Sequence, residues 1–200
     1  MLMEIVLSPE QTATMAELYG EMEGAYDRVA GRIHLRCSDC DDNCCDSFFY
    51  HYTRCEWAYL WQGLRALPEP VLADVLSRAQ IYVQGLPGRN PRSTRHIPCP
   101  LLVEGRCVLY QHRLMICRLH GVPSLLRRPD GQRVQFPGCF RSQHICQEQP
   151  GLLGQYVDRT PFLLRLARLE KELLAALAQQ VVRPRLTIAE MIVNGPPTVA

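Results

Sequence analysis

The sequence has almost no lysine and no long apolar segment. Lys171 is the only lysine among 22 basic residues, a bias that a GC-rich genome explains as well as a function does. The formal net charge of +2 excludes a strongly cationic protein of the kind that binds nucleic acids or membrane surfaces. No apolar run approaches the roughly 20 residues of a membrane-spanning helix, and the N-terminus lacks the basic and apolar regions of a signal peptide. We therefore expect a cytoplasmic protein with no membrane and no nucleic-acid partner.

The sequence motifs of common catalytic sites are also missing. We find no Ser-His-Asp order, no glycine-rich phosphate loop and no dinucleotide-binding fingerprint. The basic stretches RNPRSTR and RRPDGQR contain no interleaved aromatic residues, so we interpret them as solvated loops rather than RNA contacts. The sequence therefore leaves open whether the protein is an enzyme.

Cysteine, in contrast, is abundant, with 10 residues in a chain of 200. In a reducing compartment, dense cysteine more often binds a metal or performs chemistry than forms disulfides. A disulfide-bonded secreted protein is the alternative, and it would need export without a visible signal. All the cysteines except Cys55 fall into two clusters, which read Cys37-x2-Cys40-x3-Cys44-Cys45 and Cys99-x7-Cys107-x9-Cys117 followed by Cys139 and Cys146.

The spacing of the first cluster favours metal binding. Thiolates two or three residues apart can converge on one ion, because a tight turn points both side chains inward. Adjacent cysteines such as Cys44 and Cys45 usually point apart, so the pair permits two metal centres without requiring them. Cys55 lies in an aromatic segment, where we expect it to pack rather than to bind a metal. We predict that at least four of the other cysteines are metal ligands.

Histidines and charged residues near the clusters provide further candidates. One histidine could replace a thiolate, although we interpret each of them as solvent-exposed or hydrogen-bonded: His34, His51, His96, His112, His120 and His144. We interpret Arg54 and Glu56 as partners in ion pairs on a helix surface, in preference to the lining of a small pocket.

The cysteine motifs carry a resemblance to a known family. C-x2-C-x3-CC, then CPLLVEGRCVLYQHRLMICRLHG at 99–121 and PGC at 137–139 resemble the YkgJ-like cysteine-cluster family, which is described as a zinc- or iron-chelating domain. The sequence departs from the family pattern in the three residues before the double cysteine and in Leu114, where proline is usual. The resemblance covers about residues 37–146, and it implies eight metal ligands: Cys37, Cys40, Cys44, Cys45, Cys99, Cys107, Cys117 and Cys139. Cys146 is an extra candidate by proximity alone.

The ligand type and spacing favour some metals over others. Sites made only of thiolates favour zinc or iron–sulfur. The chain has one short C-x2-C knuckle and then widely spaced cysteines, and a cubane is larger than one ion and bridges distant loops more easily. Cys99-Pro100 is similar to the Cys-Pro that closes ferredoxin ligand runs. We therefore favour one or two iron–sulfur clusters of the 4Fe–4S type over Zn2+.

Helix signals dominate the rest of the chain. We predict helices over 9–32, 48–67, from 71 to near Gly85 and over 155–181, a capping box at Thr187–Glu190 that opens a short helix, a hairpin around Asp130-Gly131 and a loose tail at PPTVA. The fold class we expect is mainly α, with helices surrounding a cysteine-rich, loop-dominated metal-binding insert and little β structure. We expect a single domain over 1–200, with an N-terminal helix (1–36), a cysteine-cluster region (37–146) and a C-terminal helical arm (147–200).

Three functions compete on this evidence. The favoured one is a protein with a cysteine-ligated iron–sulfur centre that is structural, transfers electrons, or does both. The alternatives are a zinc-stapled protein-interaction module and a metal-dependent protein-modifying enzyme, which the family's association with flagellin lysine methylation implies, with an open coordination site near His51 and Glu56. The partner would be an unidentified protein or a redox protein, and the C-terminal helix could form a homodimer.

Overall fold

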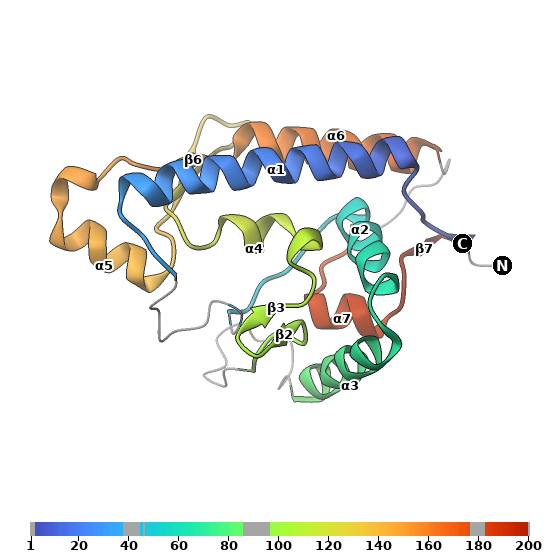
Figure 1. The fold of residues 1–200 in the computed structure, drawn as a ribbon. Helices are drawn as coiled ribbons and strands as arrows, with labels where there is room; N and C mark the ends of the chain where they lie inside the picture. The colour runs from blue at the N-terminus through green and yellow to red at the C-terminus, as the bar shows by residue number, and fades with distance from the viewer. Residues whose placement is uncertain (1–2, 38–44, 46, 86–96, 177–182, 200) are drawn as a thin grey trace. The chain divides into compact units, whose positions relative to one another are not determined.

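A computed structural model describes residues 3–37, 45, 47–85, 97–176 and 183–199 (Figure 1). The described residues contain seven α-helices and seven strands of two to four residues, so the prediction of a mainly α fold is confirmed. Their contacts divide the chain into two compact units. Unit 1 comprises Met1–Thr12, Cys45–Leu114 and Leu169–Ala200, and unit 2 comprises Ala13–Cys44 and Met115–Arg168. The single domain and its three-part division stay predictions.

Unit 1 is organised by three helices with a shared apolar core: α2 (Arg54–Arg65), α3 (Glu69–Gly85) and α7 (Ile188–Val193). Each helix buries apolar residues spaced three or four positions apart, which places them on one face. The core includes Leu60, Leu64, Val75, Ala79, Ala189 and Ile192. Burial of these faces against one another therefore holds the three helices together.

Two indole groups connect α2 to α7. The Nε1 groups of Trp57 and Trp61 each donate a hydrogen bond to the carbonyl oxygen of Met191, at 3.0 Å. Trp57 also donates to the carbonyl oxygen of Gly195, at 3.0 Å. The bonds to Met191 satisfy a carbonyl group in the last turn of α7, and the bond to Gly195 reaches the segment just after it.

A short hairpin in unit 1 carries one of the cysteines. Strands β2 (Leu102–Val103) and β3 (Arg106–Cys107) pair in antiparallel fashion, with Leu102 opposite Cys107. Glu104 and Gly105 between them both have positive φ, at 49° and 76°. Positive φ at both central residues is the geometry of a two-residue type I′ turn. A one-turn 3-10 helix, η2 (Tyr110–His112), follows the hairpin.

The two ends of unit 1 pair with each other, contrary to the prediction of a loose tail. Strand β1 (Met3–Glu4) pairs with β7 (Thr198–Val199), and the Ile5 amide donates to the carbonyl oxygen of Pro197 at 2.8 Å. Val199 is buried, with 3 % of its surface exposed. The prediction was wrong because a tertiary contact, rather than local propensity, orders this segment.

Unit 2 contains a three-stranded sheet in the order β5 (Arg133–Phe136), β4 (Ser124–Arg127), β6 (Val157–Asp158). Strands β4 and β5 form the predicted hairpin around Asp130-Gly131, and Gly131 adopts a φ of 82° in its turn. Strand β6 pairs with β4 in parallel. The helices α4 (Met115–Leu119) and α5 (Phe140–Glu148) and the 3-10 turn η3 (Pro150–Leu152) complete the segments near the sheet.

The two longest helix predictions differ in their accuracy. Helix α1 (Pro9–Arg32) has the predicted bounds, and in unit 2 it buries Met15, Leu18, Tyr19, Met22 and Val29 at helical spacing. Helix α6 (Thr160–Ala176) begins five residues later than predicted, since Val157 and Asp158 belong to β6. The last predicted residues, 177–181, lie outside the described residues. The capping box at Thr187–Glu190 is confirmed, with reciprocal hydrogen bonds that open α7.

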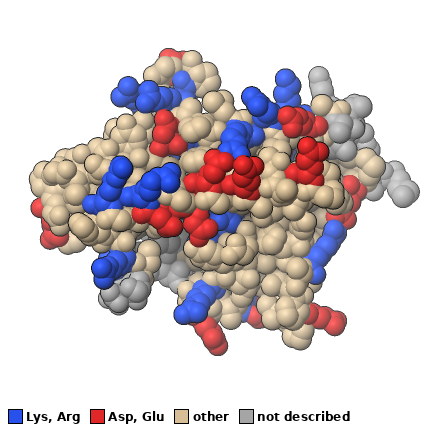
Figure 2. Space-filling model, turned by 45° about the horizontal axis from the view of Figure 1, so that its top comes forward, with Lys and Arg blue, Asp and Glu red and all other residues tan. Residues whose placement is uncertain are grey.

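Charged side chains of both signs are interspersed on the face shown in Figure 2. In unit 2, for example, Arg165 of α6 pairs with Glu21 of α1 at 2.6 Å and lies 3.9 Å from Glu17. Within the described residues, no helix is both long enough and apolar enough to cross a lipid bilayer.

Candidate metal centre

Six of the eight predicted metal ligands belong to the described part of the chain, and Cys40 and Cys44 lie outside it. The six divide equally between the compact units. We call Cys45, Cys99 and Cys107 the unit 1 cysteine group. We call Cys37, Cys117 and Cys139 the unit 2 cysteine group.

Backbone contacts bring the unit 1 cysteine group together. The Cys99 amide donates a hydrogen bond to the carbonyl oxygen of Cys45, at 2.8 Å. The Cys99 carbonyl oxygen in turn accepts from the Leu102 amide at 3.0 Å, and Leu102 lies opposite Cys107 in the β2–β3 hairpin. The end of the first cysteine motif therefore lies beside the start of the second, although 54 positions of sequence separate Cys45 from Cys99.

The unit 1 cysteine group borders the apolar core. Cys99 and Cys107 are partly exposed and pack against the core of α2, α3 and α7. Burial raises the pKa of the Tyr82 phenol on α3, and the nearby Cys99 and Glu190 raise it further. Two of the three cysteines of this group therefore have the apolar core on one side.

In unit 2, a close fit of two glycines positions Cys139. The Cys139 amide donates to the carbonyl oxygen of Gly121 at 3.2 Å. Gly138 has a φ of 83°, and a Cβ there would stand 2.7 Å from the Gly121 oxygen, so only glycine fits. A Cβ at Gly121 would in turn collide with the hydroxyl group of Tyr26. The PGC motif thus has a steric basis.

The same tyrosine links Cys139 to the first cysteine motif. The Tyr26 hydroxyl lies 3.8 Å from the sulfur of Cys37, within the range of a weak hydrogen bond to sulfur. Cys117 lies on α4, four positions before Gly121. Tyr26 and Gly121 therefore connect Cys37 with Cys139, and Cys117 lies close to them in sequence.

The side chains of the described residues do not complete a metal site. In the described ranges, no three His, Cys, Asp or Glu side chains converge as metal ligands would. The eight described cysteines also form no disulfide with one another. The donor set, which consists of thiols from two motifs with joined backbones, fits a metal that thiolates prefer. The four aspartates near the first motif, Asp39, Asp41, Asp42 and Asp46, lie outside the described residues.

The histidines have contrasting surroundings. His112 packs against Tyr59 with ring centroids 4.6 Å apart, and a Cβ at Gly63 would clash with its ring. His144 is exposed and lies 3.3 Å from Glu148 on the same helix. His34 is exposed as well, and His96 lies outside the described residues.

His51 is the histidine with the most unusual environment. Its side chain is 2 % exposed, and its Nδ1 atom has no hydrogen-bond partner among the described residues. Burial lowers the pKa of His51 from 6.5 to about 3, so the imidazole is neutral at physiological pH. The backbone of His51 forms two hydrogen bonds with Leu186, which hold the segment before α2 in an extended conformation. Helix α2 therefore begins at Arg54, whereas the sequence predicted a start at residue 48.

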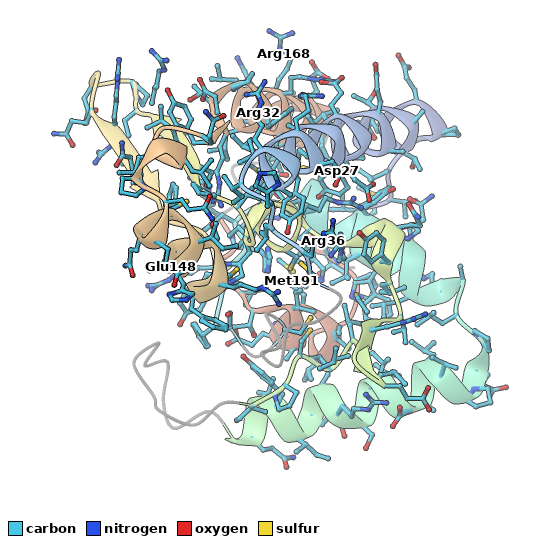
Figure 3. All side chains as sticks on the ribbon, turned by 60° about the vertical axis from the view of Figure 1, so that its left-hand side comes forward. Asp27, Arg32, Arg36, Glu148, Arg168 and Met191 are labelled. Atoms are coloured by element: carbon cyan, nitrogen blue, oxygen red, sulfur yellow. The ribbon has the colours of Figure 1, made fainter. Side chains whose placement is uncertain are left out.

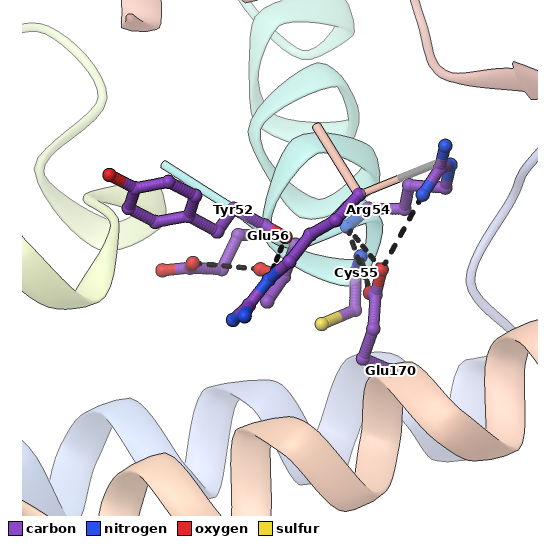
Figure 4. Close-up of polar contacts among 7 residues, drawn as sticks. Tyr52, Arg54, Cys55, Glu56 and Glu170 are labelled. Carbon is purple, nitrogen blue, oxygen red and sulfur yellow. Dashed lines mark hydrogen bonds and ion pairs between the residues drawn. The ribbon is translucent and has the colours of Figure 1, made fainter. Parts of the chain in front are cut away.

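Cys55 occupies a buried polar junction at the start of α2 (Figure 4). We define this junction as Thr53, Arg54, Cys55, Glu56 and Glu170. The Glu170 carboxylate accepts hydrogen bonds from the Arg54 amide at 2.8 and 2.9 Å and from the Cys55 amide at 2.9 Å. Thr53 makes no cap with its own side chain. Glu170 of α6 therefore satisfies the unpaired amides that begin α2.

The junction also contains a buried ion pair. Arg54 Nη1 lies 3.9 Å from Glu170 Oε1, and the two side chains are 8 % and 13 % exposed. The Thr53 hydroxyl donates to Glu56 at 2.8 Å, and Glu56 is 4 % exposed. The prediction of ion pairs on a helix surface was wrong for Arg54 and Glu56, because both side chains turn into the protein.

The environment of the Cys55 thiol agrees with a packing role. Cys55 is 1 % exposed, and burial raises the pKa of its thiol well above the ordinary value. The carboxylates of Glu170 and Glu56 raise this pKa further. A thiol that resists ionisation is a poor metal ligand, since the thiolate is the binding form.

Sequence reasoning missed Glu170 as a partner of α2. It lies 115 positions after Cys55, so no local motif connects the two. One signal was present: Glu170 follows Leu166 by four positions and precedes Leu173 by three, which places a carboxylate on the apolar stripe of α6. A charged residue in such a stripe indicates a buried partner.

Comparisons with family models, curated proteins and solved structures give no match to this chain. The resemblance to the YkgJ-like family therefore rests on the cysteine motifs alone and stays a prediction.

Proposed function

We propose that the chain is a metal-binding protein whose clustered cysteines hold one or two iron–sulfur centres that stabilise the fold, transfer electrons, or do both. Each cysteine group would contribute to such a centre, and Cys40 and Cys44 of the first motif would supply further thiols. Three observations support this proposal. The cysteine motifs resemble the family's ligand pattern, most candidate ligands are more exposed than Cys55, and a backbone hydrogen bond connects the two motifs.

The observation that carries the proposal is the hydrogen bond from the Cys99 amide to the Cys45 carbonyl oxygen, at 2.8 Å. The apolar core accounts for the position of Cys99, but it does not explain why the Cys99 backbone meets the backbone of a second cysteine. A shared inorganic ligand gives them a reason. The hairpin that presents Cys107 beside them adds a third thiol to the same part of unit 1.

The surroundings of the cysteines support ligation by these groups and packing by Cys55. Cys45, Cys99, Cys107 and Cys117 are partly exposed, and Cys37 is exposed, whereas Cys55 is sealed in the polar junction. Partly exposed thiols ionise readily in comparison with buried ones. Five of the six described candidate ligands therefore lie where a metal can reach them, and Cys139 is the buried exception.

The proposed residues would act as ligands and as their support. Cys45, Cys99 and Cys107 would hold a centre on the apolar core of unit 1, and Cys37, Cys117 and Cys139 would do so in unit 2. An iron–sulfur cluster, when bound, supplies one-electron redox chemistry whose potential depends on burial and on hydrogen bonds to sulfur. Tyr26, which contacts the Cys37 sulfur, is a candidate for such a hydrogen bond.

The burial of His51 and Glu56 disfavours a metal-dependent enzyme with an open coordination site beside them. His51 and Glu56 are 2 % and 4 % exposed, and the Glu56 carboxylate is occupied by the Thr53 hydroxyl. A substrate that needs an open coordination position beside them would not reach it.

Anaerobic purification followed by iron, acid-labile sulfide and zinc analysis tests the proposal. We expect iron and sulfide in equal amounts, about four or eight of each per chain, and a visible absorbance that bleaches on reduction. Tightly held zinc in a colourless protein would favour the zinc-stapled module, and a chain that holds neither metal would refute metal binding.

Alanine variants separate ligands from packed cysteines. Cys99→Ala and Cys117→Ala should each lose metal, and Cys55→Ala is the matched control that should keep the wild-type content. Equal metal loss in all three variants would overturn the ligand assignment.

A further inference from the structure

Unit 2 contains a cavity of about 590 Å³, a volume typical of sites for small molecules. One wall is formed by α5, where Gln143, Cys146 and Gln147 face the cavity at helical spacing. Phe136 of β5 lines it from the sheet, and the segment 150–156 closes a further side. Figure 3 shows the side chains on the ribbon of α5, with Glu148 labelled at its C-terminal end.

The cavity has no charged lining. None of the described residues around it is Asp, Glu, Lys, Arg or His, and the walls combine aromatic rings, prolines and leucines with four glutamine carboxamides. A charged ligand would lose its hydration there and find no counter-charge among the lining side chains, since Arg32 and Arg159 contact Gln155 and Phe136 without lining the cavity themselves. The lining therefore selects for a neutral ligand.

Two of the glutamines are fixed in opposite orientations. Gln143 uses its Nε2 group to donate to the carbonyl oxygen of Gly138 at 3.0 Å, which leaves its Oε1 atom as an acceptor. Gln155 uses its Oε1 atom to accept from Arg32 at 3.3 Å, which leaves its amino group as a donor. Both residues line the cavity, and the acceptor and donor that remain on them are the complement of a carboxamide.

A buried hydroxyl group also lacks a partner at this cavity. Ser124 lines the cavity and is 2 % exposed, and its Oγ atom has no hydrogen-bond partner among the described residues. Ser124 lies opposite Phe136 in the β4–β5 pairing. Buried hydroxyls are normally hydrogen-bonded, so an unsatisfied one beside a cavity indicates a missing polar partner.

We propose that this cavity binds a neutral small molecule with a flat apolar body and a carboxamide group. The body packs against Phe136 and Tyr156, and the carboxamide pairs with Gln143 and Gln155. The site involves none of the eight proposed metal ligands, so it stands or falls separately from the proposed function. Cys146, a metal candidate by proximity alone, is then a wall of this site.

Three isosteric probes test the proposal on the full-length chain: benzamide, benzoate and benzamidinium. Titration should be followed by ¹H–¹⁵N spectra of the backbone and the glutamine side-chain amides. We expect benzamide to shift the resonances of the cavity residues and to bind about tenfold or more tightly than either ion. The proposal would be overturned if the three probes bound equally, if the shifts lay outside the cavity, or if benzamide at about 10 mM caused no shift.

A matched pair of variants at the C-terminal end of α5 and just after it tests the charge preference. Gln147→Glu places a carboxylate in the cavity wall, and it should weaken benzamide and strengthen benzamidinium. Gln149→Glu makes the same change at an exposed position that does not line the cavity, so it should leave the ranking of the probes unchanged. The same ranking in both variants would contradict the site.

The thiol of Cys146 gives a measurement that needs no variant. N-ethylmaleimide labels accessible cysteines, and peptide mass analysis resolves each one. Benzamide should slow labelling of Cys146 about threefold or more when most sites are filled, and labelling of Cys37 should not change. Equal effects at both cysteines, or none at Cys146, would show that benzamide does not occupy the cavity.

Discussion

Cys55 and the unit 1 cysteine group lie in the same compact unit but have opposite surroundings. Around Cys55 the chain supplies every element of a closed site: a carboxylate that caps the helix, a buried cation beside it and almost complete exclusion of water. At Cys45, Cys99 and Cys107 it supplies a backbone contact and a hairpin, and the thiols are partly exposed. The polar junction is thus completed by protein groups, whereas the proposed metal would complete the unit 1 cysteine group.

Metal removal should separate the two regions most strongly. A chelator that strips the metal would remove on the order of 10 kcal/mol of binding free energy if the site resembles a structural zinc centre. Hydrogen exchange should then show faster exchange at the Cys99 and Leu102 amides, whereas the Arg54 and Cys55 amides, held by Glu170, stay protected. Equal loss of protection in both regions would mean that the metal does not organise the cysteine segments in particular.

Glu170→Ala should give the next largest effect, on the opposite side of the comparison. It removes three hydrogen bonds to the start of α2 and leaves Arg54 buried without its carboxylate, so we expect a loss of about 3 to 5 kcal/mol in unfolding free energy. Denaturant unfolding measures this loss. Glu170→Gln retains an acceptor oxygen and should lose about half as much. An alanine variant as stable as wild type would show that the junction contributes little.

The two regions also differ in how well the sequence predicts them. Helix α1, the α7 capping box and the Asp130-Gly131 hairpin were predictable because their signals are local. The pairing of β1 with β7 and the capping of α2 by Glu170 were not, since each joins segments that are more than 100 positions apart. For the candidate metal centre, the ligand set given by the motifs stays a prediction, and spacing alone does not say that the Cys99 amide meets the Cys45 carbonyl.

Acidification should lower the unfolding free energy through the buried side chain of His51. Burial lowers the pKa of His51 to about 3, whereas the unfolded chain has a pKa near 6.5. Below pH 6.5 the unfolded state therefore binds a proton that the folded state does not, so this contribution is complete above pH 6.5 and falls progressively toward pH 3. We expect a loss of about 2 kcal/mol at pH 5.

His51→Phe should remove that part of the pH dependence, because it replaces the imidazole by a ring that cannot be protonated. Unfolding free energies at pH 7 and pH 5 measure the difference. His34→Gln changes an exposed histidine and should keep the wild-type slope. An unchanged slope in His51→Phe would assign the acid sensitivity to other groups.

Cys55→Ala should have the smallest effect and gives the sharpest contrast with the unit 1 cysteine group. Removal of one buried sulfur leaves a small void and the Glu170 hydrogen bond to the backbone amide intact, so we expect a loss of about 1 kcal/mol in unfolding free energy. Cys55→Ser tests the environment instead of the volume, since a serine hydroxyl can donate to the nearby carboxylates that disfavour a thiolate. It should be at least as stable as the alanine variant. If Cys55→Ser proved much less stable, the site would be apolar around the sulfur, and the account of Cys55 as part of a closed polar junction would fail.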